Sequence, residues 1–221
     1  MIQASGFVPF STIDYPKCLA AVVFTQGCPW HCLYCHNPHL HSFQEKSIWD
    51  TIVFKLTQRA HLLDAVVFSG GEALLQKNLP LAMQQVKDLG YLVGLHTTGM
   101  YPKRFKMVLP LVDWVGMDIK AQFENYSQIT GIKNSGALAQ ESAKILIASG
   151  ISHEFRTTIH PTLFSVNDLL LLAKDLADMG VQSYALQKAR QFREEVQINP
   201  NFYKLETYKE IFSLFKSFTI R

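Results

Sequence analysis

The sequence predicts an α/β fold, namely a partial (β/α)6 TIM-like barrel with parallel strands in a single domain. Apolar runs of strand length alternate along the chain with longer stretches of helical period. Three helical stretches end at a glycine, Gly90, Gly150 or Gly180, which can adopt the left-handed conformation that stops a helix. Six strand–helix units in 221 residues indicate an open barrel, because a complete eight-unit barrel typically needs about 250 residues.

Several of the expected strands are nearly continuous in apolar residues, as in the segment AVVF at residues 65–68. Such runs are typical of parallel strands that are covered on both faces. Since each strand precedes a helical stretch, we expect right-handed crossovers between parallel neighbours. In chain order the strands are predicted at residues 19–26, 65–69, 91–97, 112–119, 153–160 and 182–187.

Two of the expected helices begin at a serine. Ser47 and Ser165 are suitable N-cap residues, because a serine oxygen accepts a hydrogen bond from the first helical turn. Asp168 follows Ser165 by three residues, which strengthens that helix start. The helices are predicted at residues 47–62, 74–89, 101–109, 137–149, 166–179 and 204–218.

No linker rich in Pro, Gly or Ser and no block of like charge interrupts this plan. We therefore expect residues 1–221 to form one domain, in which residues 1–18 lead into the first strand. The order of the strands in the sheet does not follow from the sequence, so a doubly wound open sheet is the alternative architecture.

The composition limits the class of protein. Hydrophobic residues make up 48% of the chain and the mean hydropathy is +0.06, as in globular proteins with a well-filled core. A net charge of +3 is too small to indicate a nucleic-acid or membrane partner. The chain shows no apolar stretch of the ~20 residues that span a membrane and no signal peptide. We therefore expect a cytoplasmic protein, in whose reducing surroundings clustered cysteines bind metal more often than they form disulfides.

Three of the four cysteines, Cys28, Cys32 and Cys35, lie in one short segment directly after the first predicted strand. One interpretation is an iron–sulfur cluster with three thiolate ligands and one iron left open for a substrate or cofactor. The other is a zinc site that a nearby histidine completes. Cys18, outside the segment, is expected to be a small core or strand residue. The histidines that could complete a zinc site are His31, His36, His39 and His41.

Polar residues and glycines also follow the other predicted strands. Because the carboxyl ends of parallel strands meet at one edge, we expect these residues to form one large ligand site. Each one alone is also common in ordinary turns, so their agreement carries the prediction. In chain order they are Gly70, Gly71, Glu72, His96, Thr98, Asp118, Lys120, Arg156 and Gln187.

The segments around these residues resemble the radical S-adenosylmethionine enzymes, whose signature is this three-cysteine spacing at the end of the first strand. The similarity is greatest to the activating proteins of glycyl-radical enzymes. Among those, the short chain without further cysteine clusters is most similar to the activating protein of anaerobic ribonucleoside-triphosphate reductase. The matching segments are residues 11–16, 24–28, 32–38, 69–76 and 118–120.

The resemblance implies a [4Fe-4S] cluster held by Cys28, Cys32 and Cys35, with S-adenosylmethionine on the fourth iron. One electron would cleave this cofactor to methionine and a 5′-deoxyadenosyl radical, which takes a hydrogen atom from a glycine of a partner glycyl-radical enzyme. The implied partner is anaerobic ribonucleotide reductase, and the implied electron donor is reduced flavodoxin or ferredoxin. The resemblance implies no catalytic residue separate from the cluster and the cofactor site.

It also implies contacts between the cysteine side of the site and the cofactor. Tyr34 would lie against the adenine, and His36 would belong to the same cofactor site. Gly70 and Gly71 would let backbone approach the methionine part closely, unless they only form a tight turn. Glu72 would bind that end of the cofactor or fix the loop.

Further contacts are implied at the ends of the fourth and fifth strands. Lys120 would pair with the methionine carboxylate, and Asp118 would hold a cation or the amino group. Arg156 would add a second carboxylate contact. The alternative for all three is an ion pair that serves only the structure.

The ribose end of the cofactor has the remaining candidates. His96 and Thr98 would reach the ribose or the substrate, although a histidine hydrogen-bonded at the rim is the alternative for His96. Gln187 lies where relatives that activate pyruvate formate-lyase carry a ribose-contacting histidine, so that contact is either replaced or absent.

Two other functions remain open at this point. One is a radical enzyme that acts on a small molecule, such as a modified-base precursor. The other is a zinc-stabilised binding module without enzymatic activity, against which the spread of polar residues over six strand ends argues.

Overall fold

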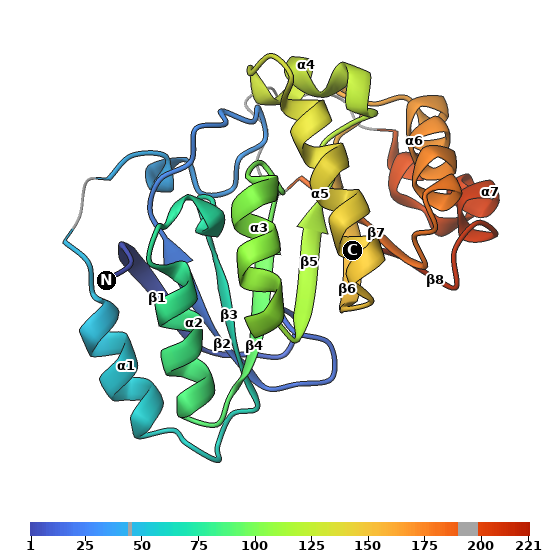
Figure 1. The fold of residues 1–221 in the computed structure, drawn as a ribbon. Helices are drawn as coiled ribbons and strands as arrows, with labels where there is room; N and C mark the ends of the chain where they lie inside the picture. The colour runs from blue at the N-terminus through green and yellow to red at the C-terminus, as the bar shows by residue number, and fades with distance from the viewer. Residues whose placement is uncertain (44–45, 190–198) are drawn as a thin grey trace.

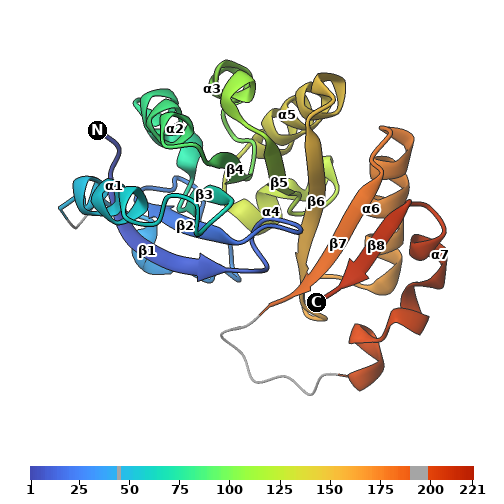
Figure 2. The same ribbon diagram turned by 90° about the horizontal axis from the view of Figure 1, so that it is seen from below.

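The computed structural model describes residues 1–43, 46–189 and 199–221. Within these residues the strands form one curved sheet of eight strands, arranged in chain order (Figures 1 and 2). The first two strands pair antiparallel, and all later neighbours pair parallel. The strands are β1 (Ala4–Ser11), β2 (Ala20–Thr25), β3 (Ala65–Gly70), β4 (Leu92–Thr97), β5 (Trp114–Asp118), β6 (Ser152–Ile159), β7 (Ser183–Lys188) and β8 (Ser217–Ile220).

Most helices cover the convex face of this sheet, as Figure 2 shows. None of the helices in the described ranges combines the length and apolar character that crossing a membrane requires. The helices are α1 (Trp49–Thr57), α2 (Leu79–Asp88), α3 (Pro102–Val108), α4 (Tyr126–Thr130), α5 (Ser135–Ser149), α6 (Val166–Asp178) and α7 (Lys209–Phe212).

The predicted partial barrel is confirmed, and its six predicted strands are β2 to β7. A doubly wound sheet reverses its strand order at a switch point, whereas the order here runs in sequence from β1 to β8. The three glycines at helix ends have the expected positive φ, at +88° for Gly90, +69° for Gly150 and +94° for Gly180.

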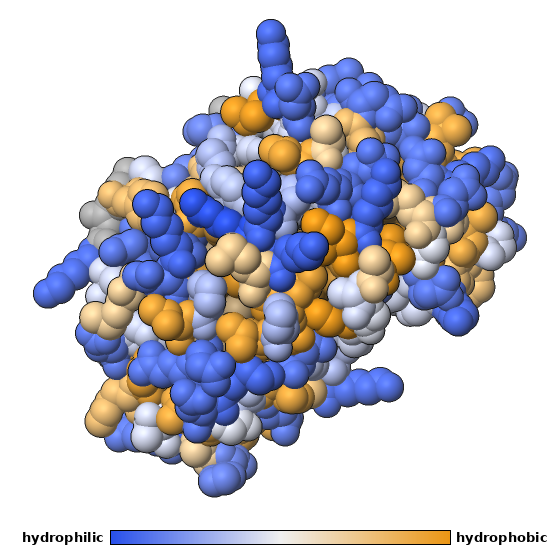
Figure 3. Space-filling view, in the orientation of Figure 1, coloured by the Kyte–Doolittle hydropathy of each residue, from blue (hydrophilic) through white to orange (hydrophobic). Residues whose placement is uncertain are grey.

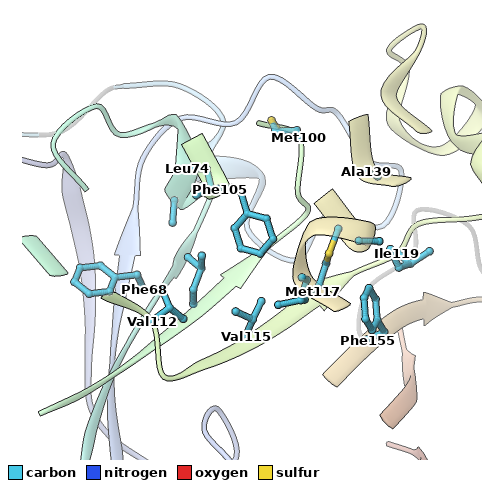
Figure 4. Packing of buried hydrophobic residues seen from close by; sticks show 14 of the residues in the cluster. Phe68, Leu74, Met100, Phe105, Val112, Val115, Met117, Ile119, Ala139 and Phe155 are labelled. Atoms are coloured by element: carbon cyan, nitrogen blue, oxygen red, sulfur yellow. The ribbon is translucent and has the colours of Figure 1, made fainter. Parts of the chain in front are cut away.

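The main core lies between the sheet and the helices. Side chains alternate along each strand, so β3 sends Val66 and Phe68 into this core and turns Ala65 and Val67 to the concave face. Figure 4 shows Phe105 of α3 among the strand residues of this core, fully buried. The regular alternation explains why the apolar runs of the sequence predicted the strands well.

The connection between β1 and β2 crosses the concave face of the sheet. The Tyr15 ring packs 5.4 Å from the Trp114 ring, centroid to centroid. Gly94 of β4 leaves space for it, since a Cβ there would lie 3.0 Å from the Tyr15 ring. Cys18 packs against the same small cluster, as expected of a core residue. Residues 1–18 were expected only to lead into the first strand. They instead supply the edge strand β1 and most of the connection that covers the concave face of the sheet.

Two predicted helices differ from the structure. The helix expected at residues 47–62 spans Trp49–Thr57. Ser47 Oγ does accept a hydrogen bond from the first turn, from the Trp49 N–H (3.3 Å), but it also accepts the Ala4 N–H and donates to the Ile2 carbonyl, which ties it to β1. The segment 204–218 is not one helix but holds a 3-10 turn, α7 and the start of β8. The β8 backbone pairs with β7 instead, since this satisfies a sheet edge that would otherwise stay open.

The start of the helix after β6 is confirmed. Ser165 Oγ accepts the Asp168 N–H, and the Asp168 carboxylate accepts the Ser165 N–H, which completes a capping box.

Candidate functional site

The three cysteines lie in the loop between β2 and a short 3-10 helix, η1 (Pro38–Leu40). Backbone hydrogen bonds close this loop at its base. Gly27 N–H donates to the Leu40 carbonyl (2.7 Å), and Cys28 N–H donates to the His41 carbonyl (3.0 Å). The chain itself therefore presents the cysteines together at the carboxyl end of β2.

The thiols of Cys28, Cys32 and Cys35 are free and partly exposed. Among the described residues, no three Cys, His, Asp or Glu side chains converge as ligands of a single metal ion. In an iron–sulfur cluster each thiolate binds its own iron, so the three sulfurs need not converge on one point. This donor set fits a cluster. Burial raises the pKa of Cys28 to about 12 and also raises that of Cys32, so iron would displace their protons on binding.

Helix α4 holds the cysteine loop against β5. The Trp30 ring lies edge-on to the Tyr126 ring at 5.9 Å, and His31 N–H donates to the Thr130 carbonyl (3.2 Å). The Tyr126 hydroxyl in turn accepts the backbone N–H of Lys120 (3.0 Å). This short helix was not predicted from the sequence, although it links two of the predicted site segments.

Tyr34 is buried, with 3% of its surface exposed. Its hydroxyl has no hydrogen-bond partner among the described residues. Lys120 Nζ lies 5.6 Å from the centroid of its ring. A buried hydroxyl without a partner costs about 1–3 kcal/mol, so a bound group that completes it is favoured. The orphaned hydroxyl beside the cysteine loop therefore fits a cofactor site.

Glu72 links the ends of β3 and β4. One carboxylate oxygen accepts from Leu74 N–H (3.0 Å) and the Thr97 hydroxyl (2.6 Å). The other accepts from the N–H (2.9 Å) and the hydroxyl (2.6 Å) of Thr98. Burial raises the pKa of Glu72, and these four hydrogen bonds oppose the rise. Glu72 thus fixes the loop, and the Thr98 hydroxyl is directed to Glu72.

Gly70 and Gly71 lie where β3 passes close to β2 and the cysteine loop. Gly70 has φ +116°, and a Cβ there would lie 2.3 Å from the Thr25 nitrogen. A Cβ on Gly71 would lie 2.4 Å from the Gly27 carbonyl oxygen. Glycine is therefore required for close approach to the protein's own backbone.

Asp118 and Lys120 form an ion pair, in which Lys120 Nζ donates to Asp118 Oδ2 (3.0 Å). Burial would lower the pKa of Lys120, but the Asp118 charge and its neighbours hold it well above its ordinary value. Burial would likewise raise the pKa of Asp118, but Lys120 and then Arg156 hold it below its ordinary value. Both groups are therefore charged near the cysteine loop.

Arg156 lies on the concave face in several contacts at once. Its Nε donates to Glu154 Oε1 (2.8 Å), and its guanidinium carbon lies 5.0 Å from the centroid of the Trp114 ring. Gly116 makes room for it, since a Cβ there would lie 2.7 Å from that carbon. The ion pair expected from the sequence as the alternative role of Arg156 is thus present, with Glu154 as its partner.

His96 lies beside Arg156 and the connection that crosses the concave face. Its Nε2 is 2.9 Å from the Asp14 carbonyl oxygen and 3.3 Å from Arg156 Nη1. Burial, and then the Arg156 charge, lower the pKa of His96 to about 4. The imidazole is therefore neutral near pH 7, and Nε2 donates to the carbonyl.

The expected residues form one connected region with two outliers. Burial raises the pKa of Cys28 and Cys32, and the charge of Lys120, which reaches both thiols, opposes part of that rise. The two outliers are His36, which is exposed within the cysteine loop, and Gln187, which pairs with Thr158 near the end of β7. Sequence reasoning missed four residues that hold the site together; they are Asp14, Thr97, Tyr126 and Glu154.

Comparison with known proteins shows the family to which the chain belongs. The model of the Radical SAM superfamily matches residues 22–184, most of the chain. The protein belongs to this superfamily. Its members use a [4Fe-4S] cluster and S-adenosylmethionine (SAM), so the chain is an enzyme of this kind, and the zinc-stabilised module without activity is excluded.

Two relatives and one solved structure sharpen the comparison. A putative glycyl-radical enzyme activating enzyme of Methanocaldococcus jannaschii is 31% identical over 218 residues, 93% of this chain and 86% of the relative. The pyruvate formate-lyase 1-activating enzyme of Escherichia coli K12 is 30% identical over 71% of this chain and 67% of its own. The structure of Streptococcus suis SuiB bound to its precursor peptide SuiA shares the fold, with TM-score 0.71 and 10% identity over 90% of this chain and 47% of SuiB. The chain is therefore homologous to activating enzymes of glycyl-radical enzymes.

Proposed function

We propose that the chain activates a glycyl-radical enzyme, and specifically anaerobic ribonucleotide reductase. The observation that carries the proposal is the meeting of Tyr34 and Lys120. These side chains join the cysteine loop to the end of β5, so the ligands of a cluster and the polar rim form one site. The similarity to a putative activating enzyme along 93% of the chain supports the class of partner.

The cysteines would hold the cluster and the rim would hold SAM. When bound and reduced by one electron, the cluster supplies the cleavage of SAM to methionine and a 5′-deoxyadenosyl radical. Cys28, Cys32 and Cys35 would ligate iron, while Tyr34 would offer its ring and free hydroxyl to the adenine end. Asp118, Lys120 and Arg156 would face SAM directly, whereas Gly70, Gly71, Glu72, His96 and Thr98 would shape the loops around it. We keep His36 and Gln187 as proposed contacts at the edge of the site.

The charged residues of the rim would orient SAM. Lys120 would exchange part of its contact with Asp118 for the methionine carboxylate, and Asp118 would then face the amino group. Arg156, held by Glu154, would keep the concave side positive. Glu72 would act through the loop, because its four acceptor positions are filled by protein donors.

The choice of partner rests on the cysteines of residues 1–221, three of which lie in one loop without a further cysteine cluster. We infer that residues 1–221 act as a single domain, in the cytoplasm, with reduced flavodoxin or ferredoxin as the electron donor. No nucleic acid or membrane takes part in this proposal.

The test is an anaerobic activation assay with reconstituted protein, SAM, dithionite and anaerobic ribonucleotide reductase of the same organism. We expect a glycyl radical by electron paramagnetic resonance, and none when the radical glycine of the partner is replaced by alanine. The Cys32→Ser variant is expected to lose both the iron and the radical, whereas Cys18→Ala keeps both. A radical on pyruvate formate-lyase alone would reassign the partner. SAM cleavage without a protein radical would favour a small-molecule substrate, and no cleavage at all would refute the proposal.

A further inference from the structure

The outer face formed by α2, α3 and the turn before α2 is unusually basic. Residues 73–112 contain Lys77, Lys87, Lys103, Arg104 and Lys106 but a single acidic residue, Asp88. Among the described residues Lys87 pairs with Asp113, whereas Lys77, Lys103 and Lys106 are exposed and form no ion pair. By contrast, α6 carries three aspartates and one lysine.

This basic face surrounds an apolar pocket. The pocket holds about 150 Å³ and is lined by Leu74, Leu79, Pro80, Met107 and Val108, with Lys77 and Arg104 at its rim. Figure 3 shows apolar side chains among hydrophilic ones over α2 and α3. An apolar pocket inside a charged rim is the usual anatomy of a protein-docking site.

The same face adjoins the cysteine loop from outside. Arg104 Nη1 donates to the Leu74 (3.1 Å) and Leu75 (2.7 Å) carbonyls, directly after the Glu72 turn. Leu75 reaches the loop itself, because a Cβ on Gly27, next to Cys28, would lie 2.6 Å from Leu75 Cδ2. The turn that supplies Leu74 to the pocket therefore also packs, through Leu75, against the residue before the first cysteine.

We propose that this face docks an acidic one-electron donor protein, a statement that rests on the proposed function because the cluster is what needs the electron. The donor is oxidised by one electron and the cluster is reduced by one, with no bond formed or broken. Basic residues would steer the acidic partner, and the pocket would take one of its apolar side chains. The proposed glycine substrate would approach the side of the sheet on which Asp118 and Arg156 lie, so the convex face is left for the donor.

The test compares two reductants of the same holoenzyme. The triple variant Lys77→Glu, Lys103→Glu, Lys106→Glu is compared with a matched control, Lys144→Glu, Lys174→Glu, Lys209→Glu, which reverses three exposed lysines elsewhere. Equal iron content and circular dichroism confirm that both fold. Cluster reduction is followed by stopped-flow absorbance with reduced flavodoxin at low salt, and separately with dithionite.

We expect the triple variant to be reduced by flavodoxin about tenfold more slowly, while the control keeps the wild-type rate. Salt should slow the wild type with flavodoxin, and dithionite should reduce all three proteins equally. An unchanged flavodoxin rate in the triple variant, or an equal loss in the control, would overturn the proposal. Loss of the glycyl radical in the triple variant with dithionite would assign the face to the glycyl-radical partner and also overturn it. Failure of the wild type to cleave SAM with dithionite would instead refute the proposed function.

Discussion

The rim of the sheet is built differently on its two sides. At the ends of β2, β3 and β4, backbone hydrogen bonds, glycine contacts and the Glu72 carboxylate join the loops. On β5 and β6, the polar side chains form ion pairs within one segment, Asp118–Lys120 at the end of β5 and Glu154–Arg156 within β6. Backbone clamps hold the same shape with or without a ligand, whereas an ion pair can exchange one partner for a bound charge. The first side therefore fixes the cluster loop, and the second side is suited to bind SAM.

On this comparison, substitutions on the first side should reduce the stability of the fold, and those on the second should reduce cofactor use. The variants are compared by the free energy of unfolding of the metal-free chain, measured by urea titration.

The largest loss is expected for Gly71→Ala. The new Cβ would meet the Gly27 carbonyl oxygen, which belongs to backbone and cannot swing aside, so we expect a loss of about 3 kcal/mol. Gly150→Ala is the matched control, since Gly150 has open space and only a positive φ, and should lose about 1 kcal/mol. Equal losses would mean that the close approach at Gly71 is unimportant.

Glu72→Gln should lose about 2 kcal/mol. An amide offers one acceptor oxygen, so its NH2 group would face donors, of which Thr98 N–H cannot turn away. Thr97→Val removes a single donor to Glu72 and should lose about 1 kcal/mol. A glutamine variant as stable as the wild type would show that Glu72 does not clamp the loop.

His96 should make the wild type lose stability in mild acid. Its folded pKa of about 4 lies below the ordinary 6.5, so the unfolded chain binds the proton first and unfolding is favoured as the pH falls from about 7 toward 4. Between pH 7.5 and 5.5 the wild type should lose about 1 kcal/mol more than His96→Gln. Parallel pH profiles of the two proteins would contradict the lowered pKa.

The smallest change in stability, under about 1 kcal/mol, is expected for Lys120→Met. A methionine fills the same space without leaving a buried charge, and the half-exposed Asp118 can turn to water. Iron content should match the wild type, yet SAM affinity, read by equilibrium dialysis, should fall at least about tenfold. Unchanged affinity would remove Lys120 from the cofactor site and weaken the contrast between the two sides.

The sequence predicted the parallel strands well because several of them, such as β2 and β3, are nearly continuous apolar runs. It missed β1, in which most side chains are at least partly exposed, and β8, which forms because the edge of β7 is available. It also missed α4, which has one turn and no apolar period of its own.

For the site, the cysteine loop and the residues at the strand ends could be predicted from the sequence, because each is a local pattern in the chain. The contact of Glu72 with Thr97 and Thr98 depends on how β3 and β4 align, and that of Arg156 with His96 spans 60 positions. Such contacts follow from the register of strands across the sheet, including β4 and β6 on either side of β5, which no local pattern encodes.

One measurement tests the central claim, that a radical formed at this site takes hydrogen from a partner's glycine. Anaerobic ribonucleotide reductase labelled with deuterium at the α-carbon of glycine is activated with SAM and dithionite, and the 5′-deoxyadenosine is analysed by mass spectrometry. We predict deuterium in the 5′-deoxyadenosine, in proportion to the glycyl radical formed. Unlabelled 5′-deoxyadenosine in the presence of the partner, without a glycyl radical, would contradict the account.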